Sequence, residues 1–272
     1  MNESNPPKGR RTGAAAAFVD AELARGCVAF SILQLARETG LGAEAAKSQL
    51  RRLGSKVVRV SPKQKFFLIV SPEHLSRGAP PVEWWLGDYF RWLSHPYYLA
   101  LQSAAVAYGS SPQSIQVTQV VTDAPRRPIR VGKLKVSFFV KRAVARTPTQ
   151  ELPNAFAPTR ISTPAATGFD LIRYAPRIGG MGRAVETLVP LLPLVRGADL
   201  HTVLEAERET ATAQRLGYLV ERAGRSALAD VIDHWLPARR PVIPLVSGRA
   251  GRPAGPVASR WHVVNNSGEF EQ

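Results

Sequence analysis

The stretch LGAEAAKSQLRRLGSK, residues 41–56, carries an apolar seam and a basic face. At roughly 100° per residue, Ala46, Leu50 and Leu53 fall within one sector of a helix and are expected to pack inward. The opposite side carries Lys47, Ser48, Arg51 and Arg52, with Lys56 just beyond. Glu44 lies in the first turn, where a negative charge suits the helix dipole. The stretch predicts an amphipathic helix whose cations either enter a DNA groove or are simply solvated.

The flanking segments decide between these interpretations. Upstream, residues 12–26 predict a helix, CVAF a short strand, and SILQLARETG a second helix with a capping pattern at Ser31 and Gln34 and a stop at Gly40. Downstream, KVVRVSPKQKFFLIV predicts a hairpin that turns around residues 61–65. This order predicts a winged helix-turn-helix over residues 12–75, preceded by a disordered basic tail at 1–11.

The charge of the chain favours a polyanionic partner. Lys plus Arg total 36 against 21 for Asp plus Glu, a formal net charge of +15. Such a chain usually binds nucleic acid, since each neutralised phosphate releases counterions, although a basic proteome gives the same composition. Residues 1–70 alone hold twelve Lys and Arg against five acids. The candidate DNA contacts are therefore the cations of the helix together with Lys63, Gln64 and Lys65 at the wing tip.

The remainder predicts a second, mixed α+β domain over residues 97–272, joined by an interdomain segment at 76–96. Trp84, Trp85, Tyr89, Phe90 and Trp92 are expected to pack the two parts together. YYLALQSAAVAYG predicts a helix that ends at Gly109, and the next two segments predict three strands with a turn at 131–133. Thr163 is expected to cap a helix with Pro164 at its first position.

A basic edge is predicted for this second sheet. Its members are Arg126, Arg127, Arg130, Lys133, Lys135, Lys141 and Arg142. These side chains either form a second DNA-facing surface or prevent aggregation at a sheet edge, and the sequence favours neither.

Catalysis finds no support in the sequence, so we expect no enzyme, no cofactor and no metal. A nuclease would need Asp-x-Lys or Glu-x-Lys and a nucleotidyltransferase Asp-x-Asp, and none of these occurs. Glu205, Glu207 and Glu209 resemble a solvated helix face. RIGGMGRA (177–184) offers an anion cradle or a glycine-rich turn, and its spacing favours the turn. The single cysteine and the absence of a long apolar run predict a cytoplasmic protein with no membrane span.

Several segments together carry a family resemblance. QVTQVVTDAPRRPIRVGKLKVSFFVK, RISTPAATGFDLIRY, GGMGRAVETL and QRLGYLVERAG resemble the AbiEi antitoxins of type IV toxin–antitoxin systems, over about residues 28–264. The resemblance implies a winged helix followed by an α+β antitoxin domain. It also implies binding to inverted repeats in the operon's own promoter, autorepression, and neutralisation of a nucleotidyltransferase-like toxin without a stable complex.

Two other function classes stay open at this level. One is a stand-alone winged-helix transcription factor that senses a ligand, and the other is a protein-interaction scaffold whose charge is incidental.

Overall fold

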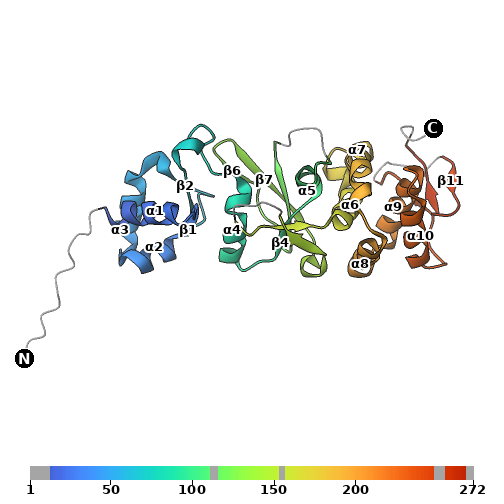
Figure 1. The fold of residues 1–272 in the computed structure, drawn as a ribbon, viewed down its shortest axis with the longest axis horizontal. Coiled ribbons are helices and arrows are strands. Elements are labelled where there is room, and N and C mark those ends of the chain that lie inside the picture. Colours follow the sequence, from blue (N-terminus) through green and yellow to red (C-terminus); the bar gives the residue numbers. More distant parts are fainter. Residues whose placement is uncertain (1–12, 111–115, 153–156, 248–254, 268–272) are drawn as a thin grey trace, which may run out of the picture. The chain divides into compact units, whose positions relative to one another are not determined.

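The computed structural model describes residues 13–110, 116–152, 157–247 and 255–267. The chain divides into two compact units, Met1–Ser94 with Pro128–Lys135, and His95–Arg127 with Val136–Gln272 (Figure 1). The tail expected at residues 1–11 lies outside the described residues. Both helices and sheets occur, which confirms the mixed α+β class.

The first unit begins with three helices and a short strand. In chain order these are α1 (Ala14–Ala24), β1 (Ala29–Ser31), α2 (Ile32–Thr39) and α3 (Ala43–Arg52). The Ser31 hydroxyl accepts a hydrogen bond from the Gln34 backbone N–H at 3.1 Å, and Gly40 ends α2 with φ 69°. The predicted cap and stop are confirmed, because the serine satisfies an otherwise free amide and glycine tolerates the left-handed turn.

A three-stranded antiparallel sheet completes the core of this unit. Strands β2 (Val57–Arg59) and β3 (Phe66–Ile69) pair with Val58 opposite Leu68, and the order is β1-β3-β2. The predicted hairpin is thus present. Phe30 of β1 lies 5.2 Å from Phe18 of α1 and 5.5 Å from Phe67 of β3, between ring centroids. These rings join the helices to the sheet.

The segment 76–96, expected as an interdomain connection, forms one 3-10 turn (Val82–Trp84) and helix α4 (Leu86–Leu93), and its residues up to Ser94 belong to the first unit. Trp85 is fully buried, and Tyr89 lies 5.5 Å from Phe66 of β3. The aromatic side chains therefore extend the core of the first unit. The same unit includes β6 (Ile129–Val131) and a turn at Gly132 (φ 53°), where an added Cβ would lie 2.1 Å from the Arg77 carbonyl oxygen.

The second unit holds most of a six-stranded sheet of order β6-β7-β5-β4-β9-β8, with β6 and the start of β7 in the first unit. The strands are β4 (Tyr97–Leu99), β5 (Thr118–Thr122), β7 (Leu134–Val140), β8 (Thr149–Glu151) and β9 (Arg160–Ser162). The predicted helix at residues 97–109 is wrong in its first turn. Residues 97–99 form the central strand β4, and α5 (Leu101–Ala107) starts after it, because pairing with β5 and β9 overrides the local helical pattern.

Five helices follow the sheet. They are α6 (Pro164–Arg173), α7 (Met181–Leu191), α8 (Gly197–Glu207), α9 (Thr210–Arg222) and α10 (Ser226–Trp235). The Thr163 side chain accepts from the Ala166 N–H and Pro164 is the first residue of α6, as predicted. Helix α6 is central, since it contacts α5, α7, α8 and α9.

A small sheet closes the described part of the chain. Its strands are β10 (Ile243–Pro244), β11 (Val257–Ala258) and β12 (Val263–Val264), and they lie side by side in the order β10-β12-β11. Just before β12, Trp261 is fully buried against α9, where an added Cβ at Gly217 would lie 2.0 Å from its ring. Only glycine fits at this point of the helix.

Candidate nucleic-acid interface and a buried ion cluster

Helix α3 is amphipathic as predicted. Ala46 and Leu50 are buried and Leu53, just after the helix, is half-buried. These side chains contribute to the core formed by α1, α2 and the sheet, so the opposite side of α3 faces solvent.

Most of the predicted DNA contacts lie on the surface of the first unit. The exposed ones are Lys47, Arg51, Arg52, Lys56, Lys63 and Lys65, and Ser48 is half-buried. Lys47 forms an ion pair with Glu44 at 2.7 Å, with both side chains largely exposed. Within the described part of the chain, the other five cations have no acidic partner in ion-pair range. Their charge is not neutralised by a neighbouring carboxylate.

A hollow of about 540 Å³ separates α3 from the hairpin and includes a residue that the sequence analysis missed. Lys47, Ser48, Arg51 and Arg59 contribute to its lining. The Arg59 guanidinium lies 5.3 Å from the centroid of the Phe67 ring and donates to the Pro62 carbonyl at 2.9 Å. Arg59 follows Val57 by two positions, so both side chains lie on the same face of β2, and both line the hollow.

Gln64 differs from the other wing residues. It is half-buried, and its Oε1 accepts a hydrogen bond from the Tyr89 hydroxyl at 3.0 Å. The side chain therefore anchors the hairpin turn to α4. We name the surface formed by Lys47, Ser48, Arg51, Arg52, Lys56, Arg59, Lys63 and Lys65 the helix–hairpin surface.

The predicted basic edge is only partly a surface. Arg127, Arg130, Lys133, Lys135 and Arg142 are exposed, and Arg126 is half-buried. Lys141 was assigned to this edge, and that assignment is wrong, because its side chain is 2% exposed. Lys141 follows β7 in phase with the buried Phe139, so strand alternation directs it inward.

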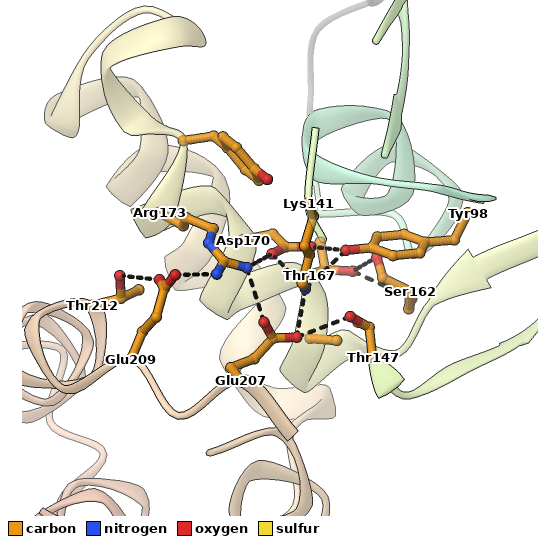
Figure 2. Close-up of polar contacts among 12 residues, drawn as sticks. Tyr98, Lys141, Thr147, Ser162, Thr167, Asp170, Arg173, Glu207, Glu209 and Thr212 are labelled. Atoms are coloured by element: carbon orange, nitrogen blue, oxygen red, sulfur yellow. Dashed lines mark hydrogen bonds and ion pairs between the residues drawn. The ribbon is translucent and has the colours of Figure 1, made fainter. Parts of the chain in front are cut away.

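Lys141 lies at the centre of a buried ion cluster, shown in Figure 2. Its Nζ donates to the Tyr98 hydroxyl at 3.0 Å and to Asp170 Oδ1 at 3.3 Å, and it also pairs with Glu207. The Tyr98 hydroxyl in turn donates to Asp170 Oδ2 at 2.7 Å. The ammonium thus has three oxygen partners, the number it can satisfy.

Arg173 extends the cluster towards α9. Its Nη1 donates to Glu207 Oε2 at 2.8 Å and its Nη2 to Glu209 (Figure 2). Thr147 donates to Glu207 Oε1 at 2.9 Å. We name Tyr98, Lys141, Thr147, Asp170, Arg173, Glu207 and Glu209 the ion cluster. It links β4, the end of β7, α6 and the α8–α9 junction.

The expectation that Glu207 belongs to a solvated face is wrong. Its side chain is 2% exposed, whereas that of Glu205 is 50% exposed. Arg208, between Glu207 and Glu209, ends α8 with φ 53°. This left-handed residue interrupts the helix and lets the carboxylates on both sides reach Arg173. Helical periodicity does not apply across the break, so spacing alone could not reveal the arrangement.

Burial dominates the electrostatics of the cluster. It raises the pKa of Asp170 above its usual range, although the charge of Lys141 opposes this shift. It also raises the pKa of Tyr98 well above 10, and the charge of Asp170 adds to the effect. For Arg173, burial alone would lower the pKa, but the hydrogen bond and charge of Glu209 outweigh it and the pKa is raised. Arg173 stays charged and Tyr98 protonated at neutral pH.

The arrangement suits stability and not substrate chemistry. The side chains of Lys141, Asp170 and Glu207 are 1–2% exposed, so no substrate reaches them. Among the described residues, no three His, Cys, Asp or Glu side chains are grouped to hold a metal ion. No helix in the described ranges has the length and apolar character of a membrane span.

The ion cluster lies within a stretch of the chain that matches a family model. Residues 98–222 match the family model described as the AbiEi antitoxin C-terminal domain, and this match supports an AbiEi-family antitoxin. This confirms the resemblance found in the sequence. The first and last residues of the ion cluster, Tyr98 and Glu209, both lie inside the match. No curated protein matches the chain.

Solved structures provide a fold comparison. The RV2827C protein from Mycobacterium tuberculosis is 18% identical, with a TM-score of 0.65, 92% of this chain and 90% of that chain being covered. At this identity the likeness shows a shared fold alone. The antibiotic-resistance factor ANT(2'')-Ia matches at 12% identity and TM-score 0.32, covering 47% of this chain and 90% of that chain. A nucleotidyltransferase-like protein from Paracoccidioides brasiliensis matches at 11% identity and TM-score 0.31, covering 54% of this chain and 88% of that chain. The last two scores are too low to indicate a common fold.

Proposed function

We propose that this chain is a DNA-binding antitoxin that represses its own operon and counteracts a nucleotidyltransferase-like toxin. The observation that carries the DNA-binding part is the helix–hairpin surface, where Lys47, Arg51 and Arg59 line one hollow and, among the described residues, only Lys47 has an acidic partner, Glu44. The antitoxin part rests on the family of residues 98–222.

In this proposal the first unit acts as a winged helix-turn-helix. Helix α3 is the recognition helix, with α2 before it and the β2–β3 hairpin as the wing. Arg51 and Arg52 meet base edges or flanking phosphates in the major groove, while Lys63 and Lys65 hold the DNA backbone. A guanidinium that contacts a guanine through two hydrogen bonds discriminates between bases, whereas a lysine on phosphate does not.

Binding to operator DNA tests the proposal. The purified protein is titrated with DNA from upstream of its own gene and with unrelated DNA of equal length, at two salt concentrations. We expect a preference for the upstream DNA that persists at the higher salt. Equal binding that weakens in parallel, with a slope near −0.9 per phosphate contact, would leave only a basic surface and exclude autorepression.

A double substitution tests whether the helix–hairpin surface is the part of the protein that recognises operator DNA. Arg51→Ala with Arg52→Ala is expected to abolish the preference for upstream DNA. Arg222→Ala with Arg239→Ala is the matched control, because it removes the same charge from exposed positions of the second unit. An equal loss in both variants would assign the effect to net charge.

The toxin partner is tested by expression in cells. A neighbouring nucleotidyltransferase-like gene is expected to arrest growth alone and to be tolerated when this chain is co-expressed. A harmless neighbour would instead favour the stand-alone transcription factor. An absence of salt-dependent DNA binding would favour the protein-interaction scaffold.

A further inference from the structure

A second polar hollow lies in the second unit, apart from both the helix–hairpin surface and the ion cluster. Its volume is about 410 Å³. Carboxamides, a hydroxyl and guanidiniums from four parts of the chain line it, namely Gln102, Gln116, Gln119, Ser137, Arg177 and Arg183. Phe139 and Ile178 supply apolar surface, and no described lining residue is acidic. The hollow therefore combines positive charge with groups that both donate and accept hydrogen bonds.

The Gln102 side chain is held in place by a backbone turn and by a second glutamine. It follows Leu101, a buried non-glycine residue with φ 55°, at the turn from β4 into α5. The Gln102 N–H donates to Gln119 Oε1 at 2.9 Å, and Gln119 Nε2 donates to Gln102 Oε1 at 3.1 Å. Gln102 is only 8% exposed, and its Nε2 has no partner among the described residues. A fixed amide donor thus remains for a ligand, held by a backbone turn that costs conformational energy.

Arg177 is fixed in a comparable way. Its guanidinium lies 4.3 Å from the centroid of the Phe139 ring, and Nη2 donates to the Phe138 carbonyl oxygen at 3.2 Å. These contacts orient the planar group and leave further N–H bonds for an anion. Arg183, whose pairing with Glu186 is long at 3.4 Å, lines this hollow and also a neighbouring one of about 690 Å³ at the start of α7.

The chemistry of the lining selects a class of ligand. Two guanidiniums without an acid in the lining suit phosphate oxygens, which only accept hydrogen bonds. Carboxamides offer donors and acceptors together, which match the edge of a nucleobase. The Phe139 ring and the stacked Arg177 provide an apolar face. We propose that this hollow binds a nucleoside phosphate, with Arg177 and Arg183 on the phosphate and the paired glutamines on the base. This site goes beyond the proposed DNA-binding function and does not depend on it.

Calorimetric titration of the full chain tests the site. The probes are the four ribonucleoside triphosphates, inorganic triphosphate, and a short single-stranded oligonucleotide with a 5′-phosphate. We expect at least one nucleotide probe to bind more tightly than inorganic triphosphate. If a ribonucleoside triphosphate binds more tightly than the oligonucleotide, the ligand is a soluble nucleotide. If the oligonucleotide binds more tightly, the ligand is the 5′ end of a strand. Equal binding of inorganic triphosphate would overturn recognition of a base, and no binding of any probe would overturn the site.

Substitutions locate the binding. Arg177→Gln and Gln102→Met, which preserves side-chain length, are each expected to weaken it about tenfold or more. Arg222→Gln is the matched control, because Arg222 is also an exposed arginine over a ring, 5.8 Å from the centroid of Tyr218. The double alanine variant of Arg51 and Arg52 should bind nucleotide normally. Equal affinity in all variants, or loss in that double variant alone, would overturn the assignment. Thermal unfolding of each variant verifies the fold, and Arg183→Gln replaces any variant that fails to fold.

Discussion

The helix–hairpin surface and the ion cluster use the same residue types in opposite surroundings. The Lys47 side chain is 54% exposed and pairs with one exposed carboxylate, whereas that of Lys141 is 2% exposed and contacts two buried ones. In water the attraction between such groups is weak, so the surface cations remain available to a partner. In the protein interior an unpaired charge is very costly, so each buried cation is tied to its carboxylates. Burial, and not residue type, separates the two environments.

The sharpest test of this contrast replaces an exposed lysine of β7 and the buried lysine that directly follows β7. Lys141→Met is expected to lower the free energy of unfolding by about 3–5 kcal/mol, because Asp170 and Glu207 lose their shared cation. Lys135→Met, at an exposed position of β7, should change it by less than about 0.5 kcal/mol. Urea unfolding measures both. A similar small change in the two variants would mean that the ion cluster does not stabilise the fold.

A second test addresses the surface. Arg51→Ala is expected to change the preference among operator sequences by about 1–3 kcal/mol, because a base-reading guanidinium is lost. Its free energy of unfolding should stay within about 0.5 kcal/mol of the original. Competition binding with single-base operator variants gives the first quantity. Lys63→Ala is the control for a phosphate contact and should weaken every sequence equally; the same uniform loss for Arg51→Ala would exclude base reading.

Alkaline pH tests the buried phenols, one of which is Tyr98 of the ion cluster. The pKa of Tyr98 is raised by burial and by the charge of Asp170, so the unfolded chain loses this proton first as pH rises through about 10. Stability should therefore decrease there, with Tyr98 contributing a slope of about 1.4 kcal/mol per pH unit. Tyr98→Phe should reduce the slope of unfolding free energy against pH, measured from pH 9 to 11. Tyr108, whose pKa burial raises to about 12, should behave in the same way when replaced by Phe. An unchanged slope in both variants would contradict the raised pKa values of Tyr98 and Tyr108.

The smallest expected effect concerns the turn between Glu207 and Glu209. Arg208→Gly should raise the free energy of unfolding by about 1 kcal/mol, since glycine adopts φ 53° without the penalty of a side chain. Arg222→Gly, at the end of α9 in ordinary helical conformation, should lower it by about the same amount. Thermal unfolding of the two variants compares them. Destabilisation by both would show that Arg208 makes contacts worth more than the relief of the turn.

The sequence by itself determined the helices α1–α3 and the β2–β3 hairpin of the first unit. The seam of Ala46 and Leu50, the cap at Ser31 and the stop at Gly40 are all local patterns, because their partners lie within one helix or one turn. The cations of α3 could be identified for the same reason. The role of the cations assigned to the basic edge of the second sheet could not be identified in this way.

Only the tertiary structure decided where Lys141 lies and what it contacts. Its carboxylate partners are 29 and 66 residues further along the chain, beyond the reach of any helical or strand period. The strand at residues 97–99 escaped prediction because its pairing partners are likewise distant, in β5 and β9. The glutamines of the second hollow, 17 residues apart, meet only after that strand is placed. Local spacing fixes which side of a helix is apolar, but the burial of a charge depends on partners that only folding brings together.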